Sequence, residues 1–100
     1  MIIVEGHVRL PNAEAIKDLL PAATAQIAAS KTEGACLDYT YAIDVLDPCL
    51  VRVLEKWDSW EGLEAHFRKP HMTPWREALA SVKFEERSLR AHDVGETRDV

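Results

Sequence analysis

Apolar and polar residues alternate in four segments of the chain, as they do in β-strands that have one buried face. The segments are residues 2–10, 35–45, 49–58 and, with weaker alternation, 82–92. Leu46-Asp47-Pro48 interrupts the alternation between the second and third segments. Because only these few residues join the two segments, we predict that they form a β-hairpin.

Matching the two apolar faces of this hairpin gives its register, since a shift of one residue would turn every side chain to the opposite face. The register places Tyr41 opposite Val53, Tyr39 opposite Glu55, and Leu37 opposite Trp57. On the reverse side it places Asp38 opposite Lys56 and Ala42 opposite Arg52. Cys36 and Cys49 then lie near opposite ends of the hairpin, so we expect no disulfide between them.

Helical spacing replaces the alternation after the first strand. One stripe is formed by the apolar residues Ile16, Leu19, Leu20, Ala23 and Ile27. Asn12 is a suitable N-cap, and we predict a helix from there through about Lys31. Pro21 lacks a backbone N–H, so we expect a kink or a loosened turn there. Gly34 is expected to end the helix in a left-handed conformation.

Two short helices are predicted between the third and fourth strands. Asp58 is expected to cap the first, with Glu61 completing a capping box. Its inward residues are expected to be Trp60, Leu63 and Phe67. Thr73 is expected to cap the second, with Pro74 at its first position. Its inward residues are expected to be Trp75, Ala78, Leu79 and Val82.

The order of elements is therefore strand, helix, strand, strand, helix pair and strand, which is the β-α-β-β-α-β order of ferredoxin-like α+β folds. It predicts an antiparallel four-stranded sheet with the helices on one face. Residues 1–93 form this single domain, and residues 94–100 form a polar tail. We expect a second copy of the chain to cover the other face, giving a homodimer and a dimeric α+β barrel. The apolar residues expected on that face are Ile2, Val4, Val8, Leu50 and Leu54.

Composition narrows the class of protein. A hydrophobic fraction of 47% argues against disorder, and a net charge of −5 without a Lys/Arg cluster argues against a nucleic-acid surface. No apolar run approaches the ~20 residues of a membrane span, and the N-terminus lacks the pattern of a signal peptide. We therefore expect a cytoplasmic protein with neither nucleic acid nor membrane as a partner. The sequence has no glycine-rich phosphate loop, so we expect no nucleotide cofactor.

Residues 54–75 concentrate the side chains that suit a binding pocket, because they include all three tryptophans and two of the four histidines. Glu55 and Trp57 are predicted to face the helices, where a carboxylate is costly unless it is paired or hydrated. Glu55 is therefore either a structural anchor, bonded to Tyr39 or to backbone N–H groups, or a polar wall of the pocket. Trp57 is either part of the core or a platform for a ligand.

His66 and His71 lie at the two ends of the connection between the short helices. Histidine is well suited to proton transfer near neutral pH. A single histidine is more often an ordinary surface residue, but two together at the rim of an aromatic-rich cluster favour a functional role. Their spacing does not place both rings on one helical face, and no Asp or Cys completes a ligand set, so we expect no metal site. His7, on the first strand beside Glu5, is a third candidate.

Four motifs occur together in this chain. They are E-G-A-C-L-D-Y at 33–39, D-P at 47–48, E-K-W at 55–57 and A-H-F-R-K-P-H-M-T-P-W at 65–75. In this order and spacing the sequence resembles the antibiotic biosynthesis monooxygenase domain family, which includes quinol monooxygenases. The resemblance covers nearly the whole chain. Relatives in this family also include haem-degrading oxygenases and an isomerase of a phosphorylated signalling molecule.

The resemblance implies a cofactor-independent monooxygenase that oxidises a quinol-like or polyphenolic small molecule with O₂, without metal or flavin. It implies that His66 and His71 correspond to the family's paired histidines and Trp57 to its E-x-W tryptophan, as catalytic residues. Other residues are then expected to bind the substrate, namely Tyr39, Glu55, Trp60, Phe67, Met72, Trp75 and His7. The haem-degrading branch resembles this sequence less, because it has an asparagine in the first strand where Gly6 and His7 stand here.

Two other functions are compatible with the same residues. One is an isomerase or proton-transfer enzyme acting on a small polar or phosphorylated metabolite, which would need a cationic contact such as Arg52, Arg68 or Lys69. The other is a non-catalytic dimer whose pocket holds a metabolite. Turnover without oxygen would favour the first, and full function after replacement of both His66 and His71 would favour the second.

Overall fold

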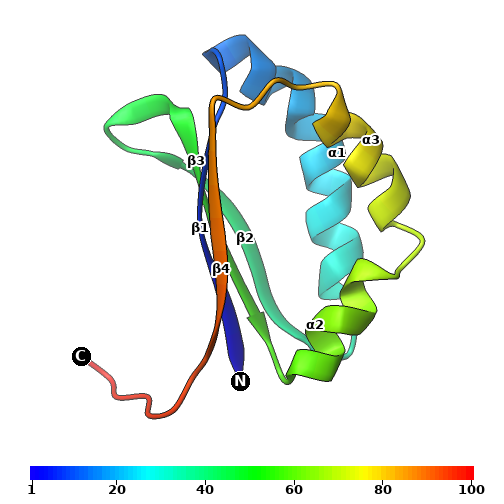
Figure 1. Cartoon of the computed structure of the whole chain (residues 1–100), viewed down its shortest axis with the longest axis vertical. Coiled ribbons are helices and arrows are strands. Elements are labelled where there is room, and N and C mark those ends of the chain that lie inside the picture. The colour runs from blue at the N-terminus through cyan, green and yellow to red at the C-terminus, as the bar shows by residue number, and fades with distance from the viewer.

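Four strands and three helices make up the protein in the computed structural model, which describes residues 1–100 (Figure 1). The elements in chain order are β1 (Ile2–Arg9), α1 (Ala13–Lys31), β2 (Cys36–Asp44), β3 (Asp47–Trp57), α2 (Trp60–Phe67), α3 (Met72–Ala80) and β4 (Glu86–Asp93). The sheet order is β2-β3-β1-β4, and every neighbouring pair is antiparallel. The helices all lie on one face of the sheet. The predicted ferredoxin-like α+β fold is thus confirmed. None of the three helices combines the length and the hydropathy that crossing a membrane requires.

Helix α1 begins and ends where the sequence predicts, but its C-terminal cap differs from the predicted one. The side chain of Asn12 accepts a hydrogen bond from the backbone N–H of Ala15 at 2.9 Å, as an N-cap does. The helix continues through Pro21. At its other end the N–H groups of Thr32 and Glu33 bond to the carbonyls of Ala29 and Ser30. Because these tight turns satisfy the last carbonyls, no left-handed residue is needed, and the predicted left-handed cap at Gly34 is wrong.

The two short helices both have caps other than those predicted. Ser59, not Asp58, caps α2, since its hydroxyl accepts from the N–H of Gly62 at 3.1 Å. Asp58 instead accepts a hydrogen bond from that hydroxyl. Helix α3 begins at Met72 without a side-chain cap. The N–H groups of Met72 and Thr73 already bond to carbonyls of the preceding turn, so Pro74 lies within the first turn, where a missing N–H costs little.

The hairpin of β2 and β3 has the predicted register over most of its length, with Tyr39 opposite Glu55 and Tyr41 opposite Val53. The predicted pairing of Leu37 with Trp57 is wrong, because a bulge near the start of β2 brings Cys36 opposite Trp57. The connection is also shorter than predicted, since β3 begins at Asp47 and leaves a two-residue turn at 45–46. Both cysteines are free thiols.

The core lies between the sheet and the helices. It is centred on the buried residues Ile2, Val4, Tyr39, Trp57 and Leu63. Ile2 lies opposite Trp57 and Val4 opposite Glu55, and directly paired residues point to the same face of a sheet. Ile2 and Val4 therefore face the helices, as does Val8, which lies opposite Val51 on the same face of β1. The predicted place of these three residues on the open face is wrong.

The open face of the sheet is mainly polar on β1 and β4. Arg9 pairs with Asp47 and Glu86, and His92 pairs with Glu5 at 3.0 Å. Gly6 lies within this region at a φ of 148°, a conformation that side-chain-bearing residues rarely adopt. A Cβ atom there would lie 1.9 Å from the carbonyl oxygen of Ser88, so β1 and β4 approach each other closely at this position.

Candidate active site

A cavity of about 890 Å³ lies between the sheet and the helices. This volume is in the range of small-molecule sites. Its walls are mostly hydrophobic and come from all three helices and all four strands. Of the predicted site residues, those that line it are Tyr39, Glu55, Trp60, His66, Phe67, Met72 and Trp75. Trp60 and Phe67 are also 42% and 49% exposed to solvent, so they lie at the edge of the cavity rather than in the core.

Trp57 is fully buried behind the cavity wall and contacts two polar residues of the site. Its indole N–H donates to Oε1 of Glu55 at 3.0 Å, and its ring packs against that of His66. Burial raises the pKa of Glu55 to about 7, more than the Trp57 hydrogen bond lowers it. Glu55 is therefore a carboxyl group that exchanges its proton near neutral pH at the wall of an apolar cavity.

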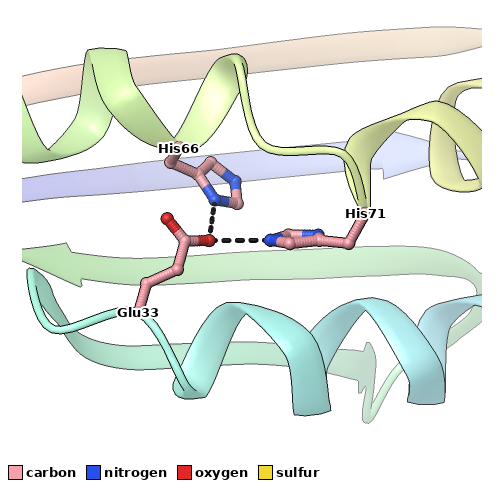
Figure 2. A group of neighbouring side chains, drawn as sticks. All are labelled: Glu33, His66 and His71. Carbon is pink, nitrogen blue, oxygen red and sulfur yellow. Dashed lines mark hydrogen bonds and ion pairs between the residues drawn. The ribbon is translucent and has the colours of Figure 1, made fainter.

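Figure 2 shows a carboxylate that joins the two predicted histidines. Oε2 of Glu33 lies 2.7 Å from Nδ1 of His66 and 2.8 Å from Nε2 of His71. Glu33 follows the end of α1, His66 lies in the last turn of α2, and His71 lies in the connection to α3. The carboxylate and the His66 ring are buried, and the His71 ring is partly exposed. The two histidines thus converge on Glu33, a residue that was not singled out from the sequence.

The charges in this group follow from burial and hydrogen bonding. Burial alone would raise the pKa of Glu33, but hydrogen bonds from His66 and His71 outweigh it and leave that pKa below its usual value. Burial lowers the pKa of His66, although the Glu33 carboxylate opposes this effect. We therefore assign a carboxylate to Glu33 and a neutral ring to His66, with its Nδ1–H donating to Glu33.

Gln26, on α1, extends the network from His71 toward the sheet. Its Oε1 lies 3.0 Å from Nδ1 of His71, and its Nε2 lies 3.3 Å from the Tyr39 hydroxyl. The same Nε2 lies 3.0 Å from the sulfur of Met72. Neither Gln26 nor Glu33 was among the predicted site residues.

Two tyrosines complete the polar wall of the cavity. The hydroxyls of Tyr39 and Tyr41 are 2.6 Å apart, and the ring of Tyr41 stacks on Trp75 with centroids 5.7 Å apart. Burial raises the pKa of both hydroxyls, so they remain protonated and can donate hydrogen bonds to a ligand. A continuous polar path thus runs from Glu33 through His71 and Gln26 to these hydroxyls.

His7 does not take part in this arrangement. It lies on the opposite face of the sheet, with Nε2 3.5 Å from Oε1 of Glu86. A separate shallow depression on that face is lined by His7, Arg52 and Arg90 among others. Three of the predicted site residues therefore do not line the helix-facing cavity. Trp57 lies behind its wall, His71 bonds to Glu33 and Gln26 beside it, and His7 lies on the opposite face of the sheet.

Known structures of the same fold were found for nearly the whole chain. A candidate antibiotic biosynthesis monooxygenase from Deinococcus radiodurans is 24% identical, with 100% of this chain and 98% of that chain covered and a TM-score of 0.89. A second candidate of this kind, from Nitrosomonas europaea, is 15% identical and has a TM-score of 0.82, with 94% of this chain and 98% of that chain covered. A conserved protein from Methanosarcina mazei is 20% identical and has a TM-score of 0.82, with 91% of this chain and 89% of that chain covered.

No curated protein matches the sequence. The structural relatives are too distant in sequence to establish more than the shared fold. The sequence model of one family does match, under the description antibiotic biosynthesis monooxygenase, and it covers residues 1–78. Because this match includes β1, α1, the hairpin, α2 and most of α3, with the residues of the site, the chain belongs to the antibiotic biosynthesis monooxygenase family.

Proposed function

We propose that this protein is a cofactor-independent monooxygenase that oxidises a quinol-like or polyphenolic small molecule with O₂. The observation that supports it most directly is a histidine that is bonded to a buried carboxylate at the wall of an apolar cavity. His66 lines the cavity, and its Nδ1–H donates to the Glu33 carboxylate. Its other nitrogen, Nε2, is then a lone-pair acceptor that makes no hydrogen bond within the protein.

In the proposed reaction the phenolic ring of the substrate lies in the cavity, against Tyr41 and Trp75. Nε2 of His66 accepts the phenolic proton, and the Glu33 carboxylate stabilises the imidazolium that forms. The hydroxyls of Tyr39 and Tyr41 supply hydrogen bonds to the substrate oxygen. Trp57 acts as a positioning residue, because it is buried behind His66 rather than exposed to the cavity.

The phenolate is electron-rich enough to transfer an electron to O₂ directly. The two radicals formed combine at a ring carbon to give a hydroperoxide. Loss of water from this adduct leaves one oxygen atom on the ring as a quinone carbonyl, and the other oxygen atom leaves in the water. The ring is oxidised by four electrons and O₂ is reduced by four, so no external reductant is required. The role of the protein is to orient the ring, remove the proton and exclude water.

Oxygen uptake tests this proposal. Metal-free protein is mixed with a panel of hydroquinones and polyphenols without any added cofactor, and oxygen consumption is followed with an electrode. Consumption by the native protein, reduced in His66→Ala, supports the proposal. Folded native protein that consumes no oxygen with any compound of the panel overturns it.

We also propose that the active form is a homodimer. The tip of the β2–β3 hairpin carries two adjacent apolar side chains, Val45 and Leu46, which are 98% and 92% exposed. Figure 1 shows this hairpin projecting away from the helices. Leu54, on the open face of the sheet, is also exposed. Apolar side chains this exposed are typical of a surface that a partner covers, and a second copy would cover both regions.

A further inference from the structure

Three metal-binding side chains converge in the site. Nδ1 of His66, Nε2 of His71 and a carboxylate oxygen of Glu33 all lie within 4.8 Å of one another (Figure 2). Metal–ligand bonds of about 2.1 Å place neighbouring donor atoms about 3 Å apart at right angles and about 3.4 Å apart in a tetrahedral site. The two nitrogen-to-oxygen distances, 2.7 Å and 2.8 Å, are a few tenths of an ångström shorter, so the donor atoms need to separate only slightly to hold an ion. His71 is the most exposed of the three and lies in a connection, so it is the ligand most able to adjust.

The orientation of Gln26 leaves a lone pair of His71 directed at Glu33. Nε2 of Gln26 lies 3.0 Å from the sulfur of Met72, and a thioether only accepts hydrogen bonds. This atom is therefore the amide nitrogen, and Oε1 accepts the Nδ1–H of His71. Nε2 of His71 is left facing a carboxylate oxygen at 2.8 Å. Two lone pairs repel each other at that distance, so a cation must bridge the two atoms. The cation is either a proton shared between them or a metal ion bound by both.

Histidines that bind metals commonly have this second contact, in which the ring nitrogen away from the metal donates to a protein acceptor. The donor set is also selective by chemistry. Two imidazoles and one carboxylate suit divalent ions of the later first transition series, whereas magnesium and calcium prefer sites made of oxygen atoms alone. The geometry, the tautomer of His71 and the ligand types therefore favour the same class of ion.

We propose that Glu33, His66 and His71 form a binding site for a divalent transition-metal ion of the zinc type, and that occupancy inhibits the enzyme. An ion on Nδ1 of His66 displaces the proton from that nitrogen and leaves the neutral ring protonated at Nε2. Nε2 then donates a hydrogen bond to the cavity and no longer accepts a proton from the substrate. The inhibition rests on the proposed function, whereas the binding site does not.

Binding is tested on the full-length protein after removal of metals with a chelator. Zn²⁺ is titrated by calorimetry, and Co²⁺ is titrated by its visible absorption, which reports ligands directly. We expect one ion per chain, a rise in melting temperature, and binding weakened about 10-fold or more in His71→Ala and Glu33→Gln. The matched control is His92→Ala, which breaks an exposed histidine–glutamate pair on the other face and should bind as the native protein does.

Absence of Co²⁺ absorption and of calorimetric heat in the native protein would overturn the site. Equal binding by His71→Ala and His92→Ala, with both folded by circular dichroism, would overturn it as well. His71 is partly exposed, so its replacement is the variant least dependent on the stability of the core.

Oxygen uptake with and without Zn²⁺ separates this inference from the proposed function. Uptake by metal-free protein that falls as Zn²⁺ binds supports both. Binding of Zn²⁺ to a protein that consumes no oxygen overturns the function and supports the site. Oxygen uptake by a protein that does not bind Zn²⁺ supports the function and overturns the site. Uptake that rises above the metal-free level when Fe²⁺ or Zn²⁺ is added overturns the inhibitory role.

Discussion

The imidazole of His66 packs against the indole of Trp57, with ring centroids 4.5 Å apart and ring planes inclined by 42°. The indole is fully buried and its N–H is held by Glu55. His66 is therefore fixed by a rigid aromatic surface as well as by its hydrogen bond to Glu33. Such a restraint limits the ring to one orientation, which is what a proton acceptor in a cavity requires.

Replacement of His66 by alanine is expected to lower kcat/KM for oxygen consumption by about 10²- to 10⁴-fold, the usual contribution of a general base. The loss follows from removal of the only unpaired imidazole nitrogen that we assign to the cavity. His92→Ala serves as the control, since His92 lies on the opposite face of the sheet. A His66→Ala enzyme with native kcat/KM would assign proton removal to another group.

Glu55→Gln is expected to make stability less dependent on pH. The folded state raises the pKa of Glu55 to about 7, from an ordinary value of 4.5, so the folded state holds this proton more tightly than the unfolded state does. The contribution of protonated Glu55 to the free energy of unfolding is fully present below pH 4.5 and is lost as the pH rises through 7. Above that pH a buried carboxylate remains, at a cost of up to about 3 kcal/mol.

The glutamine side chain resembles the protonated acid and can still accept the hydrogen bond from Trp57. The variant should therefore match the native protein near pH 4.5 and exceed its free energy of unfolding above pH 7. Urea unfolding at a series of pH values measures the difference. A difference that stays constant across the series would mean that Glu55 does not change its protonation in this range.

Gly6→Ala is expected to destabilise the fold by about 2 kcal/mol or more, because a Cβ atom would clash with the carbonyl of Ser88 at an unfavourable φ. Gly34→Ala is the matched control. Gly34 has no heavy atom within 4 Å of a Cβ and no positive φ, so its replacement should change stability by about 0.5 kcal/mol or less. Chemical denaturation of both variants checks the prediction, and equal stabilities would contradict it.

Leu46→Asp is expected to shift the protein from dimer to monomer, because it places a charge in the apolar tip that we assign to the contact between copies. Light scattering after size-exclusion chromatography gives the mass directly. Glu96→Gln, in the exposed C-terminal segment, is a control for a change of surface charge. A native protein that elutes as a monomer at all concentrations would refute the proposed assembly.

The hairpin and the order of elements could be predicted because they depend on local pattern. The pairing of Tyr39 with Glu55 follows from matching apolar faces, and it holds in the structure. The bulge that moves Cys36 opposite Trp57 leaves the alternation of the sequence unchanged, so it could not be predicted. Alternation also separates the two faces of β1 without saying which face the helices cover, and this is why the predicted face of Ile2, Val4 and Val8 was wrong.

The histidine pair could be predicted from its position in an aromatic-rich segment, but its carboxylate partner could not. Glu33 precedes His66 by 33 positions and lies in a turn after a helix, where no periodicity relates the two. Gln26 is a polar residue on α1, and the sequence pattern predicts a solvent-exposed position for it. Only the folded chain brings His71 into contact with it. Contacts of this kind arise only from tertiary packing.

The three tryptophans also differ in their exposure, so the intrinsic fluorescence of the protein can report on the cavity. Trp57 is sealed from solvent, whereas Trp60 and Trp75 line the cavity. A dissolved quencher such as iodide should therefore reduce the fluorescence of Trp60 and Trp75 and leave that of Trp57 as an internal reference. A compound that fills the cavity would shield the first two, so occupancy could be read from unlabelled protein before any turnover is detected.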